Sequence, residues 1–330
     1  MPQDPLESRL LVLIEPVVVL LVAFVGSMGL GFVAFFATAV VLEDKGVGIL
    51  VEYNRKLVVS LTPADVAEPP SLDEAADIVR DVLPGADVIV LPEEEDSWTL
   101  TAWYEDELPE GSSGAISAEL MHLGWEHPDS TLTVQPSLMA AMENPRRMKL
   151  YLPPLMGAQA LCFIAMTMLM LRWRRPRAFE KTAGLPAVFG WGVLTAVGAF
   201  VLSTLIGLTL NALGLEIEEQ AWIQALMSDG NTLLLLSPLL VLIGPISEEV
   251  FFRGYVFRRL YFGATPAWAY AVSAVLFGLI HLHWVGIPMY ITIGLMFCWV
   301  HRKTGTLWAP VVAHVVYNAG VLLIPFLVSP

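Results

Sequence analysis

The sequence predicts a mainly α-helical, polytopic membrane bundle that carries one small α/β insert. The chain has 330 residues, of which 56% are hydrophobic and only 15% are charged, and its mean hydropathy is +0.65. Soluble domains usually contain about 45–50% apolar and about 25% charged residues. This composition therefore excludes an ordinary soluble domain and a disordered chain. The polar residues are also unevenly placed, since 22 acidic and 6 basic residues lie between Glu43 and Met148.

Long apolar runs predict about seven membrane spans. A spanning helix needs roughly 20 apolar residues, and the sixth of the following runs is short. The runs are Leu10–Leu42, Leu150–Leu171, Pro186–Leu210, Asn231 to the region of Arg253, Pro266–His281, Ile287–Val300 and Leu307–Val328. We therefore expect a first anchor over residues 1–42, an insert over residues 43–148, and a membrane domain over residues 149–330 with its motifs in residues 231–330.

The distribution of basic residues predicts the orientation in the membrane. Arginine and lysine cluster around residues 172–181, 258–259 and 302–303, whereas the acidic insert falls on the alternate side. Cytoplasmic loops carry an excess of these two residues. We predict an integral protein of the bacterial inner membrane with its N-terminus inside, residues 43–148 outside and its C-terminus outside.

The insert has the pattern of a small α/β domain. Strand-like and helical segments alternate in the order β-α-β-β-α-β, and Ser71 with Glu74 forms a capping box before the first helix. This order predicts a ferredoxin-like, split βαβ arrangement. The acidity argues against binding to nucleic acid or to anionic lipid. A spacer or docking domain, with a protein partner as one option, is the favoured interpretation.

Two carboxylates and one guanidinium lie close together in the fourth apolar run. Charged groups in a span are costly and indicate function. Glu249 and Arg253 are four residues apart, with the acid first, so we expect an ion pair along one helix face. Glu248 lies about 100° from Glu249 around the helix, so it is expected to interact with a partner other than Arg253.

Helix spacing predicts which residues join Glu248. The chain breaks at Gly263–Pro266, midway between Glu248 and His281, so an antiparallel hairpin would place these two residues at one depth. In the last run, His314 and Asn318 are four apart and share a helix face. We therefore expect Glu248, His281, His314 and Asn318 to form one polar site.

These side chains suit hydrolysis by an activated water. Glu248 near His281 could take a proton from water, while His314 and Asn318 could stabilise the developing oxyanion. Zinc bound by Glu248, His281 and His314 is an alternative. The sequence contains neither a His-Glu-x-x-His motif nor a Gly-x-Ser-x-Gly motif, and no cofactor is favoured.

Three ordered motifs in the last third of the chain resemble the CPBP family of membrane proteases, which includes the type II CAAX prenyl proteases and bacteriocin-processing or immunity proteins. The motifs are Glu248-Glu249-x-x-x-Arg253, Phe277-x-x-x-His281 and His314-x-x-x-Asn318. The resemblance implies an intramembrane endopeptidase of glutamic or metallo type with Glu248 as general base, and with Glu249, Arg253 and Phe277 in support.

The insert distinguishes this chain from the family core, which does not require it. It makes a prenylated substrate less suitable than a bacterial protein with a membrane-anchored or C-terminal sorting segment, as in the myxosortase branch. Two other functions stay open at this point. One is a non-catalytic binding or immunity protein that keeps the fold. The other is a proton-coupled transporter, which predicts inverted repeats that the sequence lacks.

Overall fold

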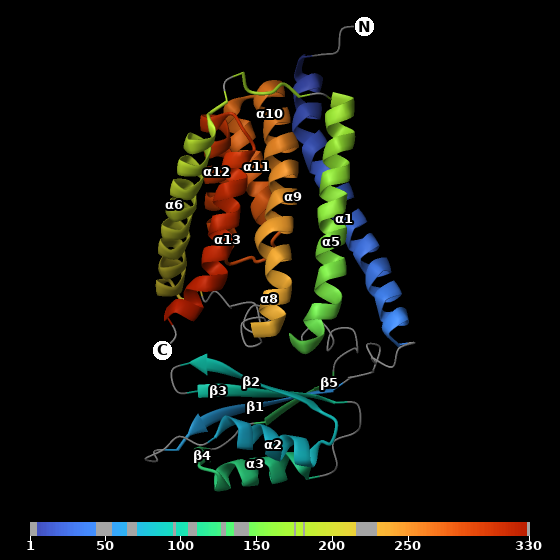
Figure 1. Ribbon diagram of the computed structural model, residues 1–330, viewed down its shortest axis with the longest axis vertical. Coiled ribbons are helices and arrows are strands. Elements are labelled where there is room, and N and C mark those ends of the chain that lie inside the picture. The colour runs from blue at the N-terminus through green and yellow to red at the C-terminus, as the bar shows by residue number, and fades with distance from the viewer. Residues whose placement is uncertain are drawn as a thin grey trace. The chain divides into compact units, whose positions relative to one another are not determined.

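The protein divides into two compact units (Figure 1). The computed structural model describes residues 5–43, 55–64, 71–94, 97–104, 111–126, 130–134, 145–174, 176–180, 182–215 and 230–328. A helical unit comprises Met1–Phe35, Leu152–Glu218 and Leu234–Pro330, and an α/β unit comprises Phe36–Tyr151 and Glu219–Leu233. Each unit is described separately.

The helical unit is a bundle whose helices run along a common direction (Figure 1). One long helical rod in it is interrupted by two π-helical segments, η1 and η2. The rod consists of α8 (Gly230–Pro238), η1 (Leu239–Ile243), α9 (Gly244–Phe251), η2 (Phe252–Phe257) and α10 (Arg258–Gly263). The other helices are α1 (Pro5–Glu43), α5 (Pro145–Arg174), α6 (Leu185–Ala212), α11 (Pro266–Leu279), α12 (Ile287–Thr304) and α13 (Trp308–Val328).

Four helices in the described residues are long and apolar enough to cross a membrane. They cover Leu10–Gly31, Leu152–Arg174, Leu185–Ala212 and Leu233–Gly263. The protein is therefore an integral membrane protein, but the expected number of seven spans is not confirmed. Helix α11 has 14 residues, a length of about 21 Å, whereas the hydrocarbon core is about 30 Å thick.

One helix boundary differs from the expectation. The fifth apolar run was expected to continue to His281, but α11 ends at Leu279 and His281 lies in the loop before α12. The prediction that His281 projects from a helix is therefore wrong. Leu282, the next residue, has a φ of 53°, in the left-handed region that disfavours a helix of L-residues.

The α/β unit has the strand order expected from the sequence. Its elements are β1 (Arg55–Pro63), α2 (Leu72–Val82), β2 (Asp87–Glu94), β3 (Ser97–Tyr104), α3 (Ser112–His122), β4 (Trp125–Glu126) and β5 (Ser130–Val134). Strand β1 pairs with β3 on one edge and with β4 and β5 on the other, β2 pairs with β3, and all pairs are antiparallel. Figure 1 shows α2 and α3 on one face of the sheet. Without the short β4, this is the split βαβ order.

Alternation along β1 forms the core of the α/β unit. Leu57, Val59 and Leu61 are fully buried, because every second side chain of a strand points to the same face. They pack with buried residues of α2 such as Val79. The expected cap is also present, since the Ser71 hydroxyl accepts a hydrogen bond from the Glu74 amide at 3.3 Å.

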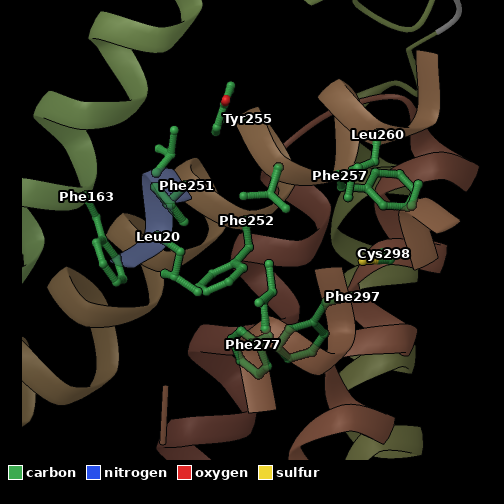
Figure 2. Close-up of a cluster of buried hydrophobic side chains, with 14 of the residues drawn as sticks. Leu20, Phe163, Phe251, Phe252, Tyr255, Phe257, Leu260, Phe277, Phe297 and Cys298 are labelled. Atoms are coloured by element: carbon green, nitrogen blue, oxygen red, sulfur yellow. The ribbon is translucent and has the colours of Figure 1, made fainter. Parts of the chain in front are cut away.

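An aromatic cluster forms the core of the helical unit (Figure 2). Phe163 of α5 stacks on Phe251 with ring centroids 4.8 Å apart, and Phe252 meets Phe277 of α11 edge-on at 5.4 Å. Phe277 in turn contacts Phe297 of α12 at 6.3 Å. The cluster thus joins four helices directly beside the expected polar residues.

A second group of charges lies at one end of the bundle and is called here the Glu15 junction. The Glu15 carboxylate of α1 accepts hydrogen bonds from Arg259 at 3.1 Å through each oxygen and from the Tyr255 hydroxyl at 2.8 Å. It also pairs with Arg174 of α5 at 3.0 Å. Nearby, the Arg258 guanidinium donates to the Pro176 carbonyl at 2.8 Å. Basic residues from the ends of α5 and α10 therefore lie together, while the compartment they face stays a prediction.

Candidate active site

The expected ion pair is present and has a third member. Arg253 Nη1 lies 2.9 Å from Glu249 Oε1, and both side chains are fully buried. The same carboxylate oxygen lies 2.9 Å from Nδ1 of His314 on α13. Glu249 therefore holds a histidine of another helix in addition to the arginine of its own.

Arg253 is fixed from three sides. Its Nη2 donates to the Gly294 carbonyl of α12 at 3.0 Å. The guanidinium also lies over the Phe277 ring, 4.6 Å from its centroid, a distance at which a cation is attracted to an aromatic face. Arg253 and Phe277, expected as supporting residues, thus form the packing behind Glu249.

Glu248 lies in a different environment from Glu249. Its side chain is 14% exposed, and its buried Oε2 has no hydrogen-bond partner among the described residues. Glu249 Oε2 is also unpaired there, but Glu249 Oε1 bonds to both Arg253 and His314. Nε2 of His314 lies 4.0 Å from Glu248 Oε2. This separation is too long for a direct hydrogen bond. Glu248 therefore presents an acceptor that the fold itself does not use.

His314 lies between the two carboxylates. An ionised Glu249 can only accept, so His314 Nδ1 carries the hydrogen of that contact. The other ring nitrogen, Nε2, faces Glu248. In the neutral ring this nitrogen accepts a hydrogen bond, and in the protonated ring it donates one.

His281 is held by its own helix end and by α12. Its Nδ1 lies 2.8 Å from the Phe277 carbonyl. Because a carbonyl only accepts, Nδ1 must donate, which leaves Nε2 as the acceptor of the neutral ring. The ring stacks on Tyr290 with centroids 4.1 Å apart. Phe277 contacts both His281 at 4.9 Å and His314 at 5.8 Å, so one aromatic ring packs against both histidines.

Asn318 makes a contact that the sequence did not predict. Its Nδ2 donates to the Leu240 carbonyl of η1 at 2.9 Å. In this π turn the Gly244 N–H donates to the Leu239 carbonyl. The next residue, Pro245, has no backbone N–H. The Leu240 carbonyl therefore lacks a backbone donor, and one hydrogen of the Asn318 amide replaces it.

Two further participants carry no sequence signal. Gly294 contributes a backbone carbonyl, which no side-chain motif can reveal. Tyr290 is one aromatic residue in an apolar helix, and its position over His281 depends on the conformation of the loop between α11 and α12.

The described residues contain no group of three or more His, Cys, Asp or Glu side chains arranged to hold a metal ion. The alternative zinc set of Glu248, His281 and His314 is thus not gathered as ligands. In both histidines Nδ1 bonds to protein oxygen, so Nε2 is the nitrogen that would bind a metal.

The fold and the polar site together define a class: a membrane protein whose helical bundle encloses carboxylates, histidines and an asparagine suited to hydrolysis. Residues 230–320 match the family described as type II CAAX prenyl endopeptidase Rce1-like. This range includes every candidate residue of the site. The match confirms, for this part of the chain, the resemblance to the CPBP membrane proteases.

A curated relative supports the same comparison. The chain is 32% identical over 82 residues to YdiL of Bacillus subtilis (strain 168), which is named, provisionally, as a membrane peptidase. The matched segment is 25% of this chain and 34% of that relative, so the chain covers about a third of its length. No solved structure matches this chain.

Proposed function

We propose that the protein is an intramembrane endopeptidase that hydrolyses a peptide bond in a membrane-associated protein. The observation that carries this proposal is the Glu248 carboxylate. It lies inside the bundle, one oxygen lacks a hydrogen bond within the described structure, and that oxygen faces His314 at 4.0 Å. A buried acceptor that the fold leaves unused is expensive and is typical of a site that binds water or substrate.

The proposed reaction uses one water. Glu248 takes a proton from this water, and the resulting hydroxide adds to the carbonyl carbon of the substrate. The carbonyl oxygen becomes an oxyanion, which a protonated His314 stabilises through Nε2–H. The proton on Glu248 then passes to the leaving amine as the C–N bond breaks. His281 accepts a hydrogen bond from the water through Nε2 and so orients it.

Glu249 and Asn318 take more specific roles than the sequence suggested. Glu249 holds the His314 ring through Nδ1, as the carboxylate of a Ser-His-Asp triad orients its histidine. Asn318 donates one amide hydrogen to the Leu240 carbonyl. The second amide hydrogen is the one proposed to bind the oxyanion. Both roles require α13 to lie against the rod of η1 and α9.

The site suggests the kind of substrate and the orientation of the protein. A site within apolar helices suits a protein with a membrane-anchored or C-terminal sorting segment. We propose an inner-membrane protein with the N-terminus inside and residues 43–148 outside, in line with the gathering of basic residues at one end of the bundle. The α/β unit would then recruit a substrate or a protein partner.

The proposal is tested by mapping new protein N-termini in bacterial membranes that contain wild type, Glu248→Gln or Glu119→Gln. Glu119 is an exposed acid of α3 and controls for the chemical change alone. We expect membrane-protein fragments with wild type and Glu119→Gln that are absent with Glu248→Gln. Identical fragments in all three would contradict catalysis by Glu248 and favour the binding or immunity function. Zinc content of the purified proteins, measured in parallel, separates the glutamic from the metallo type.

A further inference from the structure

His281 differs from the other candidate residues in how its backbone is held. Glu248, His314 and Asn318 lie within helices, whereas His281 lies in the loop between α11 and α12. The following residue, Leu282, adopts a φ of 53°. Helix geometry therefore does not fix the direction of the His281 ring, and side-chain contacts must do so.

Two contacts determine the position of this ring. The hydrogen bond from Nδ1 to the Phe277 carbonyl, 2.8 Å long, determines which nitrogen carries the hydrogen. This hydrogen bond alone does not fix the plane of the imidazole ring, because the ring can still turn about the line from Nδ1 to the carbonyl oxygen. The stack on Tyr290, with centroids 4.1 Å apart and an interplanar angle of 20°, fixes the plane of the ring.

Close packing of α11 against α12 brings Tyr290 to this place. A Cβ atom on Gly278 would lie 3.0 Å from a side-chain carbon of Ile291, the neighbour of Tyr290. A Cβ on Gly294 would lie 3.0 Å from the Cα of Ala274. These distances are shorter than most Cβ contacts, so glycine at both positions favours the close approach of α11 and α12 that places Tyr290 over His281.

We propose that Tyr290 is a positioning residue for the reaction described above: its ring holds the His281 imidazole so that Nε2 points toward the water that Glu248 deprotonates. The inference rests on the proposed function and names a residue outside the three motifs. The ring is the group that acts, since the described structure contains no hydrogen bond from the Tyr290 hydroxyl and the stack uses only the aromatic face.

The test compares Tyr290→Leu, which removes the stack, with Tyr290→Phe, which keeps it. Leu295→Ala truncates an exposed side chain of the same helix and is the control. The first measurement is the NMR signal of the His281 ring in full-length, histidine-labelled protein in detergent micelles, assigned by its loss in His281→Ala. The second is kcat and KM with a substrate found in the N-terminus mapping.

The aromatic ring at position 290 should shift the NMR signal of the His281 ring. We expect this ring-current shift in wild type, Tyr290→Phe and Leu295→Ala, and its loss in Tyr290→Leu. We expect kcat to fall about tenfold or more in Tyr290→Leu with little change in KM, because a small misplacement of a reacting group is costly. Tyr290→Phe should restore kcat to within about threefold of wild type.

Each contrary result has a separate meaning. An unchanged His281 signal in Tyr290→Leu would overturn the proposed contact, whatever the activity. Loss of kcat in Tyr290→Phe equal to that in Tyr290→Leu would assign the role to the hydroxyl and overturn the stacking argument. If Glu248→Gln cleaves as wild type does, the proposed function fails, while the NMR comparison still decides whether Tyr290 holds His281.

Discussion

Two carboxylates in the helical unit, Glu15 and Glu248, have opposite surroundings. Glu15 accepts from Arg259 through both oxygens and also contacts Tyr255 and Arg174, so its charge is balanced by donors from three other helical segments, α10, η2 and α5. Glu248 has a buried oxygen without any hydrogen bond among the described residues. The comparison teaches that a charge inside a bundle need not indicate chemistry. Glu15 and Glu249 are bound to arginines and join helices, whereas Glu248 has no arginine partner among the described residues and is available to react.

The largest expected effect comes from breaking the ion pair beside Glu248. Arg253→Leu leaves the Glu249 carboxylate buried without its arginine, and loss of one partner of such a pair costs about 3–5 kcal/mol. We expect a large fall in folded protein recovered from membranes and a lower melting temperature in micelles. Replacing both partners, with Glu249→Met and Arg253→Leu, should recover part of the stability. Equal instability of the single and double variants would contradict this coupling.

Glu248→Gln should remove activity while leaving the fold intact. The amide cannot act as a base, so we expect kcat to fall by about 10²- to 10⁴-fold. The melting temperature should stay at or above that of wild type, because the change removes a charge that the fold does not pair. Turnover by this variant close to that of wild type would show that another group activates the water.

The same substitution at the Glu15 junction should do the reverse. Glu15→Gln keeps the size of the side chain but removes the charge that faces Arg174 and Arg259. Loss of charged hydrogen bonds at a partly buried site costs about 1–3 kcal/mol. We expect a lower melting temperature and an unchanged kcat per folded molecule. A fall in kcat as large as that of Glu248→Gln would contradict the claim that Glu15 only joins helices.

The smallest effect is expected in the α/β unit, where charges lie at the surface. Ser71→Ala removes the hydroxyl that accepts from the Glu74 amide and should destabilise α2 by about 1 kcal/mol. Hydrogen exchange of the α2 amides in the full-length protein measures this change. Slower or unchanged exchange at those amides would show that the cap does not contribute. Exchange in α9 serves as the internal control and should not change.

The sequence predicted local features better than contacts between distant segments. The α/β elements followed from alternation and the Ser71 cap, and the Glu249–Arg253 pair followed from helix spacing, because such patterns are local. His314 binding to Glu249 depends on how α13 packs against α9, which spacing within one helix cannot reveal. His281 lay beyond its predicted helix, since a left-handed Leu282 gives no sequence signal.

Asn318 shows a different limit. A motif identifies the amide but not the atom it bonds, and its partner is a backbone carbonyl that becomes available only through the π turn at η1. Proline is visible in the sequence, but a proline can produce a kink, a break or a π turn. The structure was therefore needed to assign one of the two amide hydrogens to Leu240.

The π turn before Pro245 also changes how positions along this helix must be counted. In a regular α-helix, a residue seven places after Leu236 returns to the same face after two turns. A π turn contains about one residue more than an α turn. The inward face therefore reappears one or two places later, at the buried Pro245, and returns four residues on at the buried Glu249. A single-residue deletion within Leu239–Ile243 would restore regular winding and keep the segments on either side on the same faces, because the π turn takes up its extra residue within one turn. Alignments of related chains should therefore accept a one-residue gap at this segment.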